Sequence, residues 1–134
     1  MQTQTIEIET GAREVVLDIT RQCETALGAV DDGLLHVFVP HATAGIAILE
    51  TGAGSDEDLL NALQDLLPAD NRWIHQHGSK GHGRSHVMPA LIPPYASIPI
   101  IDGRLALGTW QSICLIDLNV DNHIRQVRLS VLRG

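Results

Sequence analysis

The chain has 134 residues, a length typical of one compact domain. Apolar residues make up 44% of it and charged residues only 19%, a composition that supports a single core and excludes a disordered chain. The formal net charge of −7 has the wrong sign for a protein that coats a phosphate backbone, so nucleic acid is not expected as a partner.

The sequence also bears on where the protein resides. Its longest apolar stretches fall far short of the roughly 20 residues that cross a bilayer, so no membrane partner is expected. The first nine residues alternate polar and apolar side chains and lack the features of a signal peptide. Cys23 and Cys114 are the only cysteines, too few for a disulfide scaffold, and we expect two reduced, buried thiols in a cytoplasmic protein.

The N-terminal region predicts two strands and a helix. Apolar and polar side chains alternate over residues 6–8 and 15–17 on either side of Gly11, which predicts a β-hairpin. Thr20 is the expected cap of a helix that runs to residues 31–33. The apolar stripe of this helix consists of Cys23, Ala26, Leu27 and Val30.

Two strands and a second helix follow. Residues 34–39 are apolar and β-branched enough for a strand that Pro40 ends, and residues 46–50 predict the next strand. Ser55 is the expected cap of the second helix, which Pro68 ends. The apolar stripe of this helix is formed by Leu59, Leu60, Leu63, Leu66 and Leu67.

Residues 69–99 form the longest irregular segment, rich in Gly, His and Pro, with at most a short helical turn near residues 85–91. A loop of this length in a compact domain is typical of a functional segment, and its apolar residues indicate that it is held against the domain. A hairpin with its turn at residues 102–103 follows, and residues 111–118 and 124–132 predict the last two strands. The order of elements predicts a single α+β domain over the whole chain, a largely antiparallel meander with two main helices.

Histidine is the unusual residue of this sequence, because four of the seven histidines fall within twelve residues. His77, His82 and His86 have a spacing that allows three imidazoles to hold a divalent metal, zinc or magnesium, with one position left open. His82 and His86 are four residues apart and share one side of any helical turn there. The alternative is that these histidines are loop residues that only hydrogen-bond a substrate.

Three further groups are candidates for catalysis. His41 follows a strand and could act as a general base, a metal ligand or an anion contact, or be a structural histidine. Glu50 and Asp56 flank residues 51–54, where two carboxylates and a helix N-terminus could meet. For Asp56 the alternative is the ordinary preference of a helix for acidic residues in its first turn.

The candidate substrate-binding residues lie in three places. Lys80 and Arg84 alternate with glycines and could neutralise a phosphate, although no Walker spacing is present. Trp110 could stack on a planar heterocycle or be packed in the core, and Gln111 can hydrogen-bond a ligand. Thr43, in the connection after His41, is the remaining candidate.

Four stretches together resemble the YjbQ-like family, whose members are commonly labelled secondary thiamine-phosphate synthases. They are residues 41–45, Glu50, residues 77–86 and residues 102–111, the last being the most specific, and the resemblance covers residues 34–133. It implies a curved antiparallel sheet, half-barrel or sandwich-like, in a homotrimer with pockets near the subunit boundaries. The functional residues of the family correspond here to His41, Glu50, Asp56, His77, His86, Trp110 and Gln111.

The resemblance implies an enzyme that joins a pyrimidine pyrophosphate to a thiazole phosphate and releases pyrophosphate, with His41, Glu50, Asp56 and His86 as catalytic residues. One alternative is a metal-dependent hydrolase of a small phosphorylated or carboxylated metabolite, in which Glu50 or Asp56 activates water. Another is a trimeric binder of a small anion or cofactor with no catalytic activity. All three share a small, phosphorylated or otherwise anionic ligand as partner.

Overall fold

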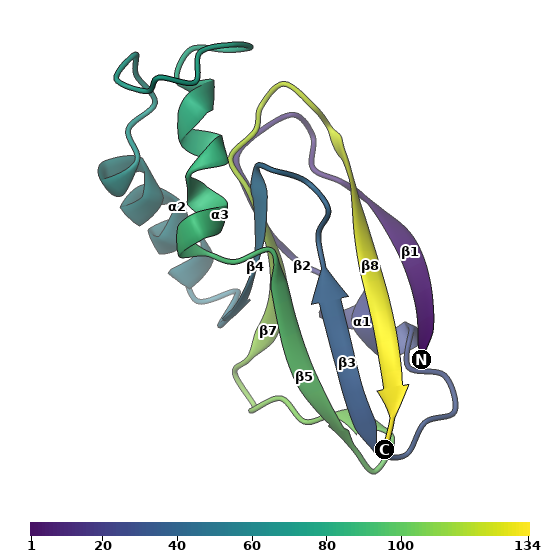
Figure 1. Cartoon of the computed structure of the whole chain (residues 1–134). Coiled ribbons are helices and arrows are strands. Elements are labelled where there is room, and N and C mark those ends of the chain that lie inside the picture. Colours follow the sequence, from purple (N-terminus) through teal and green to yellow (C-terminus); the bar gives the residue numbers. More distant parts are fainter.

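The computed structural model describes residues 1–134 and consists of two curled antiparallel β-sheets with α2 and α3 on one outer side (Figure 1). The α+β class and the curved, largely antiparallel sheet are thus confirmed. The larger sheet has the order β1 (Gln2–Glu9), β8 (Ile124–Arg133), β3 (Gly33–Phe38), β5 (Tyr95–Ile101) and β6 (Arg104–Leu105). The smaller sheet has the order β2 (Val15–Asp18), β7 (Ser112–Asp117) and β4 (Ala44–Leu49). The helices are α1 (Thr20–Thr25), α2 (Ser55–Leu66), the 3₁₀ helix η1 (His82–His86) and α3 (Met88–Leu91).

The predicted hairpin at the N-terminus is wrong. Both strands exist, but β1 pairs along its whole length with β8, and β2 pairs with β7 in the other sheet. The left-handed residues Gly11 and Ala12 turn the chain from one sheet to the other instead of closing a hairpin. Alternating polarity identifies a strand but not its partner, because the partner here lies about one hundred residues away in the sequence.

Helix α1 is shorter than predicted and ends at Thr25. Thr20 does not cap it, because Ile19 holds the cap position and the Thr20 hydroxyl accepts a hydrogen bond from the Ile113 N–H at 2.9 Å. The predicted apolar stripe is nevertheless buried, and it closes the core between the two sheets. Its members are Cys23, Ala26, Leu27 and Val30.

Strand β7 is buried on both faces, which its continuous apolar run accommodates. Ile113 and Leu115 face the core between the sheets, whereas the alternate residues face α2 and α3. Leu59, Leu60, Leu63 and Leu67 of the predicted apolar stripe of α2 pack in or against the second core, whereas Leu66 is 64% exposed. Gly54, with φ of 102°, precedes the helix, and Ser55 makes no side-chain cap. The second core consists of Leu63, Leu67, Met88, Cys114, Ile116 and Leu118.

The register of the small sheet determines which loops meet. Ala44 pairs with Asp117 at one end of β4 and β7, and Leu49 pairs with Ser112 at the other end, about 17 Å away. The connections before β4 and after β7 therefore leave the sheet at the same end. The segment between α2 and α3, teal to green at the upper end of Figure 1, lies at this end too, whereas Glu50 and Gln111 leave the sheet at the opposite end.

Candidate functional site

Four imidazoles from the segment between α2 and α3 converge at this end of the molecule. His75 and His77 are two residues apart on the exposed segment before η1, and His82 and His86 are four residues apart on η1. One nitrogen of each ring lies within 4.8 Å of the others, and His82 Nε2 lies 3.0 Å from His86 Nε2. The three histidines expected to hold a metal are brought together, and His75, which that expectation omitted, joins them.

Gly83 allows the two halves of this segment to approach each other. A Cβ atom at position 83 would lie 2.3 Å from the His75 carbonyl oxygen and 2.6 Å from the Trp73 Cβ, so only glycine fits. Trp73 is itself anchored, because its indole N–H donates to the Pro68 carbonyl oxygen at 2.8 Å. Gly83 is thus the residue that permits the histidines to meet.

The orientation of the rings separates three histidines from the fourth. The His77, His82 and His86 rings are tilted against one another by 46° to 70°, with centroids 4.6 to 5.7 Å apart. A zinc ion about 2.0–2.1 Å from three nitrogens would hold the ring centres about 5 Å apart. His75 instead stacks on His86 at 4.1 Å and 16°, and two nearly parallel rings cannot direct their in-plane lone pairs at one point.

Asp121, after β7, completes the surroundings of His82. Its Oδ2 lies 3.1 Å from His82 Nδ1, a buried nitrogen that has no aligned hydrogen bond in the protein. A proton on Nδ1 leaves Nε2 with a free lone pair directed toward His86. A carboxylate behind a histidine in this way is the common outer contact of a metal-binding imidazole, because it fixes the ring and raises its basicity.

The environment of His86 favours its neutral imidazole. Burial lowers the pKa of His86 below its ordinary value of 6.5, and charge on His75, His82 and His77 would lower it further. The neutral ring is the form that binds a transition metal, because only that form has a free lone pair. The lowered pKa of His86 therefore keeps its lone pair available to a metal near neutral pH.

A cavity of about 430 Å³ opens beside the histidines. It brings His41 to the same space as His77, His82 and His86, although position 41 is far from them in the sequence. Its other walls come from the connection before β4, the loop after β7 and the start of β8. These further residues are Ala42, Thr43, Gly78, Asn119, Asp121, Asn122, Ile124 and Arg125.

His41 is held in one orientation in this cavity. Its Nε2 accepts a hydrogen bond from the Gln126 N–H at 2.9 Å, so the neutral ring carries its proton on Nδ1. Burial and the nearby Arg125 lower the pKa of His41, which keeps the ring neutral. His41 is therefore a hydrogen-bond donor to the cavity, and the general-base role considered above would require the bond to Gln126 to break.

A buried polar network underlies the cavity. Asp117, fully buried, accepts hydrogen bonds from the Thr43 hydroxyl at 3.2 Å and from the Asn119 N–H at 2.8 Å, and it forms an ion pair with Arg125. Thr43, considered above for substrate binding, thus lines the cavity but uses its proton internally. The polar residues at the end of β7 and in the loop after it were not predicted as site residues, although their alternating pattern was an available signal. These are Asp117, Asn119, Asp121 and Asn122.

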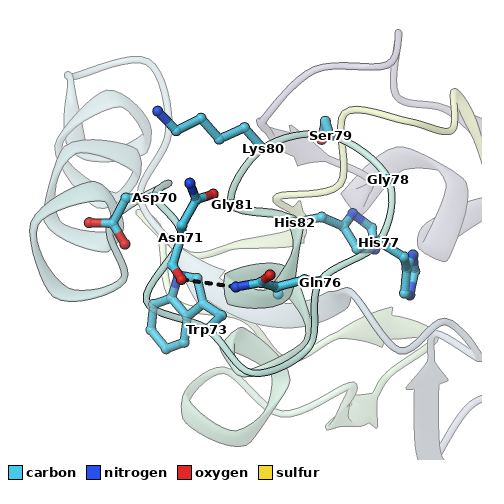
Figure 2. Close-up of a pocket in the computed structure, with 11 residues that line it drawn as sticks. Asp70, Asn71, Trp73, Gln76, His77, Gly78, Ser79, Lys80, Gly81 and His82 are labelled. Atoms are coloured by element: carbon cyan, nitrogen blue, oxygen red, sulfur yellow. Dashed lines mark hydrogen bonds between the residues drawn. The ribbon is translucent and has the colours of Figure 1, made fainter.

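The two cations proposed for substrate phosphate are placed differently. Arg84 is 3% exposed, forms an ion pair with Glu14 and donates to the Leu67 carbonyl oxygen at 3.0 Å, so it is a structural residue. Lys80 lines a smaller adjoining cavity of about 170 Å³ and lies across the loop from the His77 and His82 rings (Figure 2). The Ser79 N–H and hydroxyl both donate to Asp121, and therefore are not free for a phosphate.

The remaining predicted site residues lie at the other end of the small sheet. Glu50 follows the far end of β4, and Asp56 begins α2 nearby. Gln111 uses its side-chain oxygen to accept from the Gly108 N–H at 2.7 Å, and Trp110 is 72% exposed rather than packed in the core. Within one chain these four residues do not line the histidine cavity.

The fold and the site together define a small α+β protein with a curled antiparallel sheet and a histidine cavity at one end of it. Residues 4–134 match the family model described as "UPF0047 protein YjbQ-like", and the chain belongs to this family. A UPF0047 protein of Mycobacterium tuberculosis is 53% identical over the full length of both chains. The Bacillus subtilis UPF0047 protein YugU is 32% identical over 81% of this chain and 83% of its own.

Solved structures agree with this assignment. A hypothetical protein from Aeropyrum pernix has a TM-score of 0.91 and 32% identity, with all of both chains covered. A YbjQ-like protein of unknown function from Sulfolobus solfataricus has the same TM-score and 25% identity, covering 99% of this chain and 97% of its own. No helix of the present chain is long and apolar enough to span a membrane.

Proposed function

We propose that the protein is a metal-dependent hydrolase of a small polar metabolite, with zinc held by His77, His82 and His86. One observation carries this proposal: three mutually tilted imidazoles have their nitrogens within 4.8 Å and border an open polar cavity. Three protein ligands and one accessible position are the arrangement of catalytic zinc sites. Histidine nitrogens favour zinc over magnesium, which prefers oxygen ligands.

At such a metal site, residues of the chain would hold the histidine rings in position. The metal supplies Lewis acidity and lowers the pKa of water. Asp121 holds the His82 ring through Nδ1, and the hydrogen bond from Gln126 holds His41. Asp121 is itself fixed by two donors from Ser79, so the position of the carboxylate is determined by the loop that carries His77.

Metal analysis of the untagged protein tests this proposal. We expect about one zinc per chain in the wild type, and loss of it in the His82→Ala, His86→Ala double variant. His36→Ala is the matched control, because His36 lies on β3 with its Nδ1 against the Ser97 hydroxyl, away from the cluster. A wild type that binds no zinc at micromolar concentrations contradicts the proposal.

Turnover is the second requirement. A panel of phosphate and carboxylate esters and amides would be tested with the zinc-loaded protein and with the metal-free protein. Hydrolysis that requires zinc supports the hydrolase. A ligand that raises the melting temperature and is never converted would identify instead a binder without catalytic activity.

A thiamine-phosphate synthase activity is the second candidate function, supported by the cationic Lys80 in the adjoining cavity, where a pyrophosphate could be neutralised. It is the weaker candidate, because Trp110 and Gln111 do not reach the cavity within one chain. Incubation with the pyrimidine pyrophosphate and the thiazole phosphate tests it. Thiamine phosphate formed by the wild type and not by His86→Ala would favour the synthase over the hydrolase.

We also propose that the chain forms a homotrimer in which a neighbouring subunit presents its Glu50 end to the histidine cavity. Support comes from large apolar side chains exposed at that end, Trp110 at 72% and Ile48 at 37%. Light scattering should give three times the chain mass of 14.5 kDa. In a mixture of inactive Glu50→Gln and inactive His86→Ala chains, recovered activity would support a site shared between subunits. A monomeric wild type would contradict the homotrimer.

A further inference from the structure

We infer that the cavity contains an anion-binding subsite, formed by Arg125, His41 and Asn122, which holds an oxyanion of the substrate beside the metal site. The inference rests on the proposed function for the position of the reacting bond, but the subsite itself depends only on the groups described next. Such a subsite would select a small-molecule substrate that carries a carboxylate or phosphate group in addition to the bond that is cleaved.

Arg125 is the central residue, because one of its donors is buried without a partner. The residue is 3% exposed and lines the cavity at the start of β8. Its Nε contacts the Asp117 carboxylate and its Nη1 donates to the Ile124 carbonyl oxygen at 2.8 Å. Its Nη2 has no hydrogen-bond partner in the protein. A buried guanidinium donor without a partner is costly, so an acceptor supplied by a ligand is the natural complement.

His41 and Asn122 add donors on the same wall. The Nε2 of His41 is occupied by the Gln126 N–H, which leaves Nδ1–H as the free polar group of a neutral ring. The Asn122 side-chain oxygen accepts from Asn119 Nδ2 at 2.9 Å, which leaves its own NH₂ group free. Both residues line the same cavity as Arg125.

The side-chain acceptors next to Arg125 are already engaged. Asp117 accepts from Thr43, Asn119 and Arg125, and the Asn119 side-chain oxygen accepts from the Asp121 N–H at 2.8 Å. Asp121 Oδ2 faces Ser79 and His82 on the histidine side. The unsatisfied groups of the Arg125 wall are thus donors, a pattern that is complementary to an oxyanion and not to a cation.

Calorimetric titration of the metal-free protein with inorganic phosphate, and separately with acetate, tests the subsite without any need for turnover. We expect saturable binding of at least one of the two anions, and which one binds distinguishes a phosphate-bearing from a carboxylate-bearing substrate. Arg125→Lys keeps a positive charge near Asp117 but removes Nη2, and should weaken binding about tenfold or more. His41→Phe should weaken it as well.

Arg104→Lys is the matched control, because it makes the same exchange of arginine for lysine on the exposed β6 and should leave anion affinity unchanged. Circular dichroism and zinc affinity establish that each variant is folded. Zinc binding by the wild type without saturable binding of either anion overturns the subsite and leaves the metal site intact. Equal anion affinity of the wild type and Arg125→Lys overturns the subsite too. Anion binding without zinc binding would contradict only the proposed hydrolase.

Discussion

Asp121 Oδ2 lies 3.1 Å from His82 Nδ1, and the opposite nitrogen of the same ring lies 3.0 Å from His86 Nε2. The imidazole of His82 therefore connects a carboxylate held by the loop after β7 to the rest of the histidine cluster. This contact requires one orientation of the His82 ring. The contribution of Asp121 to metal affinity can therefore be measured by replacing Asp121.

Replacing Asp121 by asparagine should weaken zinc binding about 10- to 100-fold, because the amide cannot supply the negative charge that fixes the His82 ring and raises its basicity. Competition with a chromogenic chelator measures this affinity. Asp102→Asn is the control, since Asp102 lies in an exposed turn with φ of 51°, a conformation that asparagine tolerates. Equal zinc affinity of Asp121→Asn and wild type would show that this carboxylate has no part in metal binding.

The stability of the metal-free protein should fall as the pH is lowered from 8 to 5. Burial holds the pKa of His86 below its ordinary value of 6.5, so below that pH the unfolded chain binds more protons than the folded one. The stabilisation is present above pH 6.5 and is lost as the pH falls toward the lowered pKa of the folded state. Carboxylates stay ionised over most of this range and contribute little.

Urea unfolding at several pH values measures this dependence. His86→Gln should have a shallower dependence than the wild type, because it removes one of the groups responsible. His41, whose pKa is also lowered, should account for part of what remains. A His86→Gln variant with the same dependence as the wild type would assign the effect to other groups.

Much of the fold could be predicted from the sequence because local patterns determine single elements. The apolar stripe of α2 and the alternation in β8 are examples, and both elements are found close to their predicted bounds. The pairing of β1 with β8 could not be predicted in this way, since it depends on the long-range competition among strands of similar pattern. The C-terminal bound of α1 was missed because the helix ends at Thr25 and Gly28, with a left-handed φ of 63°, turns the chain soon afterwards.

The site was predictable to the extent that its residues are close in sequence. His77, His82 and His86 lie within ten residues and do converge. Arg84 lies among them but its side chain turns inward to Glu14, a residue seventy positions away, and no local pattern signals that contact. Asp121 and Arg125 reach the cavity from the loop after β7 and the start of β8, so their role depends on a register that only the folded sheet defines.

Arg84→Ala should destabilise the protein by about 2–4 kcal/mol, because it removes a buried side chain, its ion pair with Glu14 and its hydrogen bond to the Leu67 carbonyl oxygen. Urea unfolding measures the change. Arg72→Ala is the control, since Arg72 is exposed and pairs only with its near neighbour Asp70. Unchanged stability together with lost turnover would instead make Arg84 a substrate contact.

Gly83→Ala should impair the histidine cluster more than the fold. The added Cβ would lie 2.3 Å from the His75 carbonyl oxygen, so the segment that carries His75 and His77 must move away from η1. We expect zinc affinity to fall about tenfold or more, because His77 moves while His82 and His86 remain. The melting temperature should change less, since neither Gly83 nor His75 is a member of either hydrophobic core. Gly108→Ala is the control, because its Cβ would meet only the flexible Gln111 side chain at 3.2 Å, and equal zinc affinity of the two variants would contradict a metal site that needs this close approach.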